Sequence, residues 1–243
     1  MNVKHDEAAE LGKEAVARYA AGLVEDGMVL GLGTGTTAVR FVRALGERVR
    51  AGLRVVGVPT SEATGALARS EGILVATLED YPRLDLDIDG ADAVDPRLNL
   101  LKGLGGALLR EKIVAAASGR FAVIVDRSKW VTTLTEGGLV PVEVVPFGWS
   151  RTKVELEDLG ATATLRARPD EPDHPYITDG GHLILDCRFD DLSDPVEIAA
   201  RMKALVGVVD HGIFIGMATM AIIGSPDGHV RVVERPTAQR EGT

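Results

Sequence analysis

Residues suited to proton transfer gather in one stretch of the chain, between positions 84 and 112. The sequence DGAD at 89–92 places two carboxylates three residues apart at a turn, where both can face one ligand and exchange protons with it. The sequence KGLGG at 102–106 sets a cation beside a loop whose backbone N–H groups a ligand can approach closely. Glu111 follows on a predicted helix whose positive N-terminal end points back at that loop. The combination suits a small phosphorylated substrate with a carbon acid or a hydroxyl that must lose a proton.

The predicted helix around Glu111 is apolar nearly all round, which indicates that the helix is buried. One face combines Glu111 with small or apolar residues, namely Ala107, Val114, Ala115 and Ser118. A carboxylate on a buried helix is costly unless it is paired or used. The alternative is a surface glutamate solvated between Arg110 and Lys112.

The other acidic residues of this stretch have structural interpretations. For the DGAD sequence the alternative is Asx-turn chemistry, which aspartate performs routinely. Asp85 and Asp87 alternate with apolar residues, so they are expected on a solvated strand face or at a sheet edge. Asp95 precedes a proline and is expected to form a turn.

A second glycine-rich loop, GLGTGTTA at 31–38, follows a predicted strand and precedes a predicted helix. It departs from the G-x-G-x-x-G dinucleotide pattern because Thr36 occupies the position of the last glycine, and no acidic residue ends the next strand. A nicotinamide cofactor is therefore disfavoured, whereas threonine hydroxyls beside backbone N–H groups fit a phosphate or a sugar. The alternative is a tight turn with a threonine as the helix N-cap.

Strands alternate with helices in the first half of the chain, which predicts an α/β fold with a doubly wound, Rossmann-like and mostly parallel sheet. The expected strands are 28–32, 54–59, 73–76, 84–88 and 121–125, and the expected helices are 5–20, 38–45, 61–70 and 106–118. In such sheets ligands bind at the carboxyl ends of the strands. The loops at 33–37 and 89–92 both follow strand ends, so they are expected to form a single site.

The chain changes character after residue 139, where a second, smaller α+β unit is expected. Its order of strand, helix, strand, strand, helix and strand fits a ferredoxin-like arrangement. The helices are expected at 151–159 and 195–205, the middle strands near 163–166 and 183–187, and a hairpin connection at 168–181. From about residue 214 the chain is expected to return to the first sheet. The predicted domains are therefore 1–139 plus 213–243, and 140–212.

The composition excludes several classes of protein. The 243 residues carry a formal net charge of −9, which argues against a nucleic-acid-binding surface. No apolar run approaches the roughly 20 residues needed to cross a bilayer, and the N-terminus lacks the apolar core of a signal peptide. The single cysteine, Cys187, is expected to be a structural thiol in a reducing compartment. We therefore expect a cytoplasmic protein with no membrane or nucleic-acid partner.

The histidines do not indicate a metal site. The five histidines stand at positions 5, 174, 182, 211 and 229, without metal-ligand spacing. No Ser-His-Asp arrangement or G-x-S-x-G sequence is visible either. The expected chemistry is proton transfer without a metal or a cofactor.

Several motifs follow one another along nearly the whole chain. They are GLGTGTTA, DGAD, KGLGGALLREKI, DRSK at 126–129, PVEVVPF, ITDGGHLILD and IGSPDG. In this combination the chain resembles the type A ribose-5-phosphate isomerases. The resemblance implies interconversion of ribose 5-phosphate and ribulose 5-phosphate through an enediolate, a step of the non-oxidative pentose phosphate pathway. It also implies a homodimer or homotetramer that binds a small sugar phosphate.

The resemblance implies roles for individual residues. Glu111 is the expected general base, Lys102 is expected to stabilise the oxyanion, and Asp89 is expected to open the furanose ring or relay a hydroxyl proton. Asp92 is expected to orient hydroxyls. The expected substrate contacts are Thr34, Gly35, Thr36, Thr37, Asp89, Gly90, Ala91, Asp92, Lys102, Gly103, Leu104, Gly105, Lys129 and Lys13.

Two positions depart from the family pattern. Ala93 replaces the glutamate of the usual DGADE, and Leu104 interrupts the usual KGGGA. If that glutamate tunes Asp92, the rate or the pH optimum of this chain differs from those of its relatives. Neither change removes a residue with an expected chemical role.

Two other functions are weighed against the isomerase. An amino-sugar phosphate isomerase or deaminase on a similar sheet is expected to use a catalytic histidine, and no histidine lies near Glu111 in the sequence. A non-catalytic sugar-phosphate sensor, the effector domain of a regulator, is expected to carry a basic DNA-binding segment, which is not apparent here.

Overall fold

The computed structural model describes residues 3–236, and these form three β-sheets. The largest sheet has seven strands, in the order β14 (Val230–Glu234), β13 (Met220–Gly224), β7 (Ser118–Asp126), β4 (Leu84–Asp89), β1 (Val29–Leu32), β2 (Val56–Pro59) and β3 (Leu74–Val75). All neighbours pair in parallel except β13 and β14. The predicted Rossmann-like sheet and the return of the chain to it after residue 214 are both confirmed.

The carboxyl ends of β1 and β4 meet at the centre of this sheet. Leu30 pairs with Leu86 and Leu32 pairs with Ile88, so the two strands end side by side. After β1 the chain moves outward to β2 and β3, whereas after β4 it moves to the other side, to β7 and β13. The strand order therefore reverses between β1 and β4, which is the place where open α/β sheets bind ligands.

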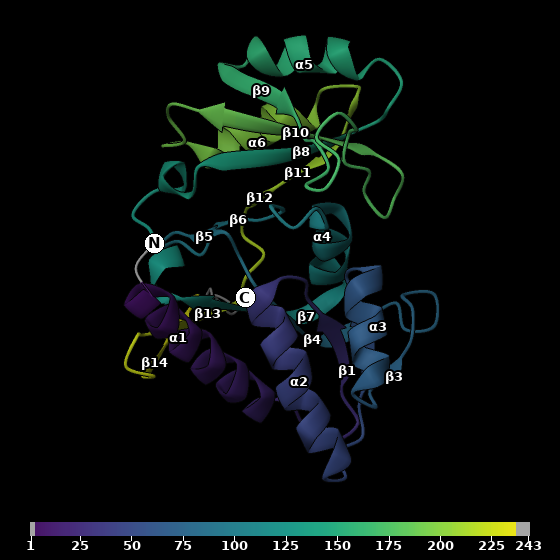
Figure 1. Ribbon diagram of the computed structural model, residues 1–243, viewed down its shortest axis with the longest axis vertical. Helices are drawn as coiled ribbons and strands as arrows, with labels where there is room; N and C mark the ends of the chain where they lie inside the picture. The colour runs from purple at the N-terminus through teal and green to yellow at the C-terminus, as the bar shows by residue number, and fades with distance from the viewer. Residues whose placement is uncertain (1–2, 237–243) are drawn as a thin grey trace, which may run out of the picture.

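Helices cover both faces of the large sheet (Figure 1). The helices α1 (Val3–Gly22) and α2 (Thr36–Arg50) pack on one face, where Phe41 joins Leu30 and Leu86 in a fully buried core. The helix α4 (Leu108–Ala117) packs on the other face, so closely that a Cβ at Gly31 would lie 2.6 Å from Val114 Cγ1. Of the helices between residues 3 and 236, none is both long and apolar enough to cross a membrane.

The helix starts depend on glycines and caps. Gly35, with a φ of +111°, is the N-cap of α2, so this helix begins at Thr36, two residues before the predicted start. The helix α3 (Glu62–Ser70) begins after Ser61, whose hydroxyl accepts the N–H of Thr64, as predicted. Gly106, with a φ of +84°, delays the start of α4 to residue 108. Because an L-residue rarely adopts a positive φ, both turns depend on glycine.

The second sheet has four antiparallel strands, in the order β11 (Val208–His211), β8 (Leu139–Val144), β10 (Leu183–Phe189) and β9 (Ala161–Leu165). With α5 (Trp149–Glu157) after β8 and α6 (Pro195–Lys203) after β10, this is the predicted ferredoxin-like order. Cys187 lies fully buried in its core, and burial raises the pKa of the thiol to about 12, in agreement with a structural role. The division of the chain into two domains at 139/140 and 212/213 stays a prediction.

A third, small sheet lies between the other two (Figure 1). Its strands are β12 (Ile213–Phe214), β6 (Leu100–Leu101) and β5 (Ala93–Val94), and the 3-10 helices η1 (Arg127–Lys129) and η2 (Leu134–Gly137) connect β7 to β8. The sequence did not predict these strands, because two residues are too few for a period-two pattern. The sheet fixes the residue that follows β6, because Lys102 N donates to Gly212 O at 2.8 Å.

Candidate functional site

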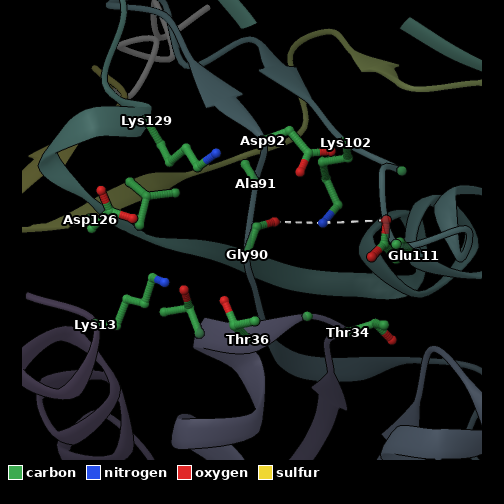
Figure 2. Close-up of a pocket in the computed structure, with 15 residues that line it drawn as sticks. Lys13, Thr34, Thr36, Gly90, Ala91, Asp92, Lys102, Glu111, Asp126 and Lys129 are labelled. Atoms are coloured by element: carbon green, nitrogen blue, oxygen red, sulfur yellow. Dashed lines mark hydrogen bonds and ion pairs between the residues drawn. The ribbon is translucent and has the colours of Figure 1, made fainter. Parts of the chain in front are cut away.

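The predicted site residues converge on one cavity of about 320 Å³ at the carboxyl ends of β1 and β4 (Figure 2). Its lining consists of Lys13, Thr34, Gly35, Thr36, Thr37, Gly90, Ala91, Asp92, Lys102, Gly103, Gly105, Glu111, Val125, Asp126 and Lys129. Of the predicted substrate contacts, Asp89 and Leu104 do not line this cavity. Residues from the two glycine loops, from the ends of β4, β6 and β7, and from the helices α1, α2 and α4 therefore form a single site, as the sheet topology predicts.

Lys102 is a buried cation between two carboxylates. Its Nζ lies 2.9 Å from Asp89 Oδ2 and 3.4 Å from Glu111 Oε2, and it donates to Gly90 O at 2.5 Å (Figure 2). Burial alone would lower the pKa of Lys102, but Asp89 and Glu111 outweigh that effect and raise it. Lys102 is therefore charged at neutral pH, although its side chain is only 2% exposed.

Glu111 is buried, so the alternative of a solvated surface glutamate is wrong. Burial raises the pKa of Glu111 to about 8, against the opposing effect of Lys102 and with a further increase from Asp89 and Asp92. Among the residues that the structure describes, Oε2 of Glu111 has no hydrogen-bond partner. A carboxyl that changes charge near neutral pH at the wall of a cavity is suited to general acid–base chemistry.

Asp89 lies behind the cavity wall and is completely buried. Its Oδ1 accepts the N–H groups of Thr34 at 3.0 Å and of Gly90 at 2.6 Å, so it joins the loops after β1 and β4. Gly33 makes this contact possible, because a Cβ there would lie 2.0 Å from the same oxygen. The other oxygen faces Lys102, and Asp89 therefore holds the cation in place.

Asp92 and Leu104 organise the loop between β6 and α4. Asp92 Oδ2 accepts the N–H of Leu104 at 3.0 Å. The Leu104 side chain is 45% exposed, so this residue contributes its backbone to the site and directs its side chain to solvent. A leucine is tolerated at this position of the glycine loop for that reason.

The opposite end of the cavity is cationic and rich in hydrogen-bond donors. Lys13 and Lys129 flank it, and the first turn of α2 brings Thr36 and Thr37 to its wall (Figure 2). The helix has no side-chain cap, so its first N–H groups are available to an anion. The alternative of a threonine N-cap is therefore wrong, because Gly35 holds that position.

Thr34 differs from the other two threonines. Its hydroxyl lies 2.7 Å from Thr60 Oγ1, 2.9 Å from Ser61 Oγ and 3.2 Å from Thr64 Oγ1, and it is directed away from the cavity (Figure 2). This hydroxyl cluster fixes the start of the loop to the start of α3. Of the three predicted threonine hydroxyls, that of Thr34 is therefore occupied within the protein, whereas Thr36 and Thr37 remain as lining residues.

Asp87 was predicted to be solvated, and this prediction is wrong. The residue is completely buried against α4, and neither carboxylate oxygen has a hydrogen-bond partner among the described residues. Burial first, and then the charge of Asp89, raise the pKa of Asp87 well above its usual range. The period-two pattern missed this because α4 covers the face of β4 that alternation marked as polar, whereas Asp85 is exposed as expected.

Sequence reasoning also omitted Asp126 from the site. Asp126 ends β7, lines the cavity, and accepts the N–H and the hydroxyl of Ser128, at 2.9 Å and 2.6 Å. Its signal was the motif DRSK, in which only Lys129 was assigned to the site. An aspartate at the end of a parallel strand is the feature that identifies it.

Comparisons with known proteins agree with this geometry. Residues 56–228 match the family model described as ribose 5-phosphate isomerase A (phosphoriboisomerase A). The ribose-5-phosphate isomerase A of Gloeobacter violaceus is 54% identical over 217 residues, which are 89% of this chain and 93% of that protein. The ribose-5-phosphate isomerase A of Thermomicrobium roseum is 52% identical over 227 residues, covering 93% and 94% of the two chains.

Solved structures give the same result. A D-ribose-5-phosphate isomerase in complex with phospho-erythronic acid superposes with a TM-score of 0.90 at 39% identity, covering 97% of this chain and 100% of that one. The ribose 5-phosphate isomerase A of Methanocaldococcus jannaschii has a TM-score of 0.87 at 38% identity, with 93% and 98% covered.

Proposed function

The chain belongs to the ribose 5-phosphate isomerase A family, and on that premise we propose how its residues interconvert ribose 5-phosphate and ribulose 5-phosphate. The observation that carries the proposal is the ion pair of Lys102 with Glu111, 3.4 Å apart, at the wall of a cavity with a cationic far end. An aldose–ketose isomerisation needs a base over two adjacent carbons and a cation near two adjacent oxygens. The pair supplies both.

Glu111 is the general base of the proposed reaction. It takes the proton from C2 of the open-chain aldose, the C2–H electrons form a C1–C2 double bond, and O1 takes the negative charge. The O2 proton then passes to O1, and Glu111 returns its proton to C1, which gives the ketose. The raised pKa of Glu111, about 8, supports this role because the group must both accept and release a proton.

Lys102 stabilises the oxyanion, and Asp89 holds Lys102. A charged ammonium fixed between Asp89 and Gly90 O is preorganised, so little reorganisation is needed when the negative charge develops. The burial of Asp89 favours this positioning role over direct transfer of a sugar proton. Asp92, which lines the cavity, orients sugar hydroxyls and fixes the loop through Leu104 N.

The phosphate binds at the start of α2, between Lys13 and Lys129. Thr36 and Thr37 offer hydroxyls and free N–H groups there, and the helix dipole adds about 0.3–1 kcal/mol for an anion. The complex of a similar solved structure with phospho-erythronic acid supports a phosphorylated ligand of this length. The phosphate end and the Glu111 end are the two ends of one cavity.

The reaction is tested with ribose 5-phosphate in deuterated water. Enediolate chemistry through Glu111 incorporates solvent deuterium at C1 of ribulose 5-phosphate, whereas an internal hydride shift does not. Because Glu111 can return the same proton, label enters only as that proton exchanges with solvent. Product and recovered substrate that both lack deuterium after many turnovers contradict the mechanism. Release of ammonia from an amino-sugar phosphate would support the deaminase instead, and binding without turnover would support a sensor.

The phosphate end is tested by replacing both Thr36 and Thr37 with valine. We expect the ratio of kcat/KM for ribose 5-phosphate over ribose to fall by about tenfold or more for each hydroxyl lost, because charge-assisted hydrogen bonds contribute about 1.5–3 kcal/mol. Thr34→Val is the matched control, since that hydroxyl is bound to Thr60 and Ser61. If the double variant discriminates like wild type, the phosphate binds elsewhere.

The assembly and the compartment are further parts of the proposal. Homodimers or homotetramers follow from the family resemblance, and light scattering of the purified protein tests them. We propose a cytoplasmic location because a single cysteine fits a reducing compartment, and cell fractionation tests it.

A further inference from the structure

We propose that Arg166, which directly follows strand β9 of the second sheet, is a positioning residue for the reaction. It sets the orientation of the loop between β6 and α4 so that the N–H of Gly105 faces the reacting end of the sugar. The inference rests on the proposed function, because it assigns a further donor to the same oxyanion.

The guanidinium of Arg166 donates hydrogen bonds from all three of its nitrogen atoms. Nη1 donates to Gly103 O at 3.0 Å and to Leu104 O at 3.1 Å. Nε donates to Asp186 Oδ2 at 2.9 Å, and Nη2 donates to Asp186 Oδ1 at 2.5 Å. The centre of the guanidinium also lies 5.9 Å from the centroid of the Tyr176 ring. A bidentate pair of this kind fixes both the position and the plane of the group.

The two carbonyl contacts determine where the following N–H groups point. In a trans peptide the C=O of one residue and the N–H of the next point in opposite directions. Since Gly103 O and Leu104 O face Arg166, the N–H groups of Leu104 and Gly105 point away from it. The N–H of Leu104 reaches Asp92 Oδ2 at 3.0 Å, on the site side of the loop.

Gly105 is the residue whose donor is left for a ligand. It lines the cavity, and its N–H has no acceptor among the residues 3–236. A backbone N–H held towards the place where negative charge develops is a strong contribution to catalysis. The structure therefore combines Lys102 and Gly105 N–H as two donors at the same end of the cavity.

The loop has one backbone hydrogen bond of its own, from Gly106 N to Gly103 O at 3.0 Å, and its glycines make it dependent on further contacts. Gly103 and Gly106 have positive φ values of +101° and +84°, and glycine readily leaves such conformations. The Leu104 side chain is 45% exposed, so it adds little packing at the centre of the loop. Tyr176, from the connection between β9 and β10, packs against the loop at Gly106, where a Cβ would lie 2.2 Å from the tyrosine hydroxyl.

The test compares Arg166→Ala with Arg168→Ala. Arg168 lies in the same connection but is exposed, and within residues 3–236 its guanidinium forms ion pairs with Asp170 and Glu171 alone. We expect Arg166→Ala to lower kcat by about 10–100-fold, part of the roughly 10²–10³-fold effect of one oxyanion donor, with KM for ribose 5-phosphate changed less than about threefold. Arg168→Ala should match wild type.

Two inhibitors distinguish a loss of loop positioning from a general loss of active-site structure. Phospho-erythronic acid carries a carboxylate where the enediolate charge develops, so its affinity should fall in parallel with kcat in Arg166→Ala. Inorganic phosphate reports the other end of the cavity, and its inhibition constant should stay unchanged. Arg166→Lys keeps one donor and should recover part of kcat.

The inference is wrong if folded Arg166→Ala keeps kcat within about twofold of wild type, or if it loses affinity for both inhibitors equally. Should Arg166→Ala fail to fold, Asp186→Asn frees the guanidinium without removing it, and an unchanged kcat in that variant also refutes the inference. A wild-type protein that does not convert ribose 5-phosphate at all refutes the proposed function instead.

Discussion

Replacement of Lys102 by methionine should destabilise the protein in a pH-dependent way. At an effective dielectric constant of about 20, the Lys102 separations of 2.9 Å and 3.4 Å from Asp89 and Glu111 correspond to about 5–6 kcal/mol per ionised carboxylate, before desolvation is counted. Methionine keeps most of the methylene packing and removes this attraction. Since Glu111 has a raised pKa and is already largely protonated at pH 7, the variant must hold one additional proton, on Asp89.

That proton determines the size of the effect. Keeping a carboxyl with an unfolded pKa of about 3.9 protonated in the folded state costs about 1.4 kcal/mol per pH unit above that value. The cost is about 4 kcal/mol at pH 7 and about 1–2 kcal/mol at pH 5. The pKa of Asp89 is raised further on folding in the variant, so the stability of the variant is retained below about pH 4 and is lost as the pH rises.

Urea unfolding followed by circular dichroism at pH 5 and pH 7 measures this difference. Lys129→Met is the control, because Lys129 lines the same cavity and forms no ion pair within residues 3–236, so a change within about 0.5 kcal/mol is expected. A loss that is equal at the two pH values would refute the electrostatic account and leave only packing. A loss below about 1 kcal/mol at pH 7 would show that Lys102 is not charged in the folded protein.

Four other predictions follow from the same groups. Glu111→Gln should lower kcat by about 10²–10⁴-fold with little change in inhibition by phospho-erythronic acid, and near-normal turnover would move the base to Asp92. In wild type, kcat/KM should rise with pH up to about 8, where Glu111 loses its proton, and a profile that is flat from pH 6 to 8 would contradict this assignment. The raised pKa of Asp87 means that its contribution to stability is complete below about pH 4 and is lost as the pH rises, so the Tm of Asp87→Asn minus that of wild type should increase between pH 4 and pH 8. Turnover should survive dialysis against EDTA, and a loss that a divalent cation restores would overturn the metal-free mechanism.

The sequence predicted the place of the site better than its internal contacts. The loops at 33–37 and 89–92 could be brought together from the strand pattern, because parallel strands end at one edge of a sheet. Their side-chain directions could not. Thr34 is turned away by Thr60 and Ser61, which follow a different strand, and no local pattern in the sequence encodes that contact.

Asp87 and Arg166 illustrate two further limits. Alternation indicates which residues share a face of a strand, but it does not indicate which helix covers that face, and α4 covers Asp87. Arg166 contacts the loop from another sheet, 62 residues away from Leu104 in the chain. The sequence does not distinguish an arginine that holds a loop from a solvated surface arginine, because the difference lies in the residues that the fold brings into contact with it.

The chain enters the four-stranded sheet and leaves it at the same point. Pro141 lies in β8, the first strand of this sheet, and Gly212 follows β11, its last strand in the chain. Gly212 N donates to Pro141 O at 2.7 Å. An insert with joined ends can be exchanged or lengthened during evolution without opening the sheet that hosts it. The freedom is incomplete here, because the carbonyl oxygens of Gly103 and Leu104 depend on an arginine inside the insert. Chimeras that exchange this segment between homologues should therefore be active only when the incoming segment carries this arginine, even where both chimeras fold.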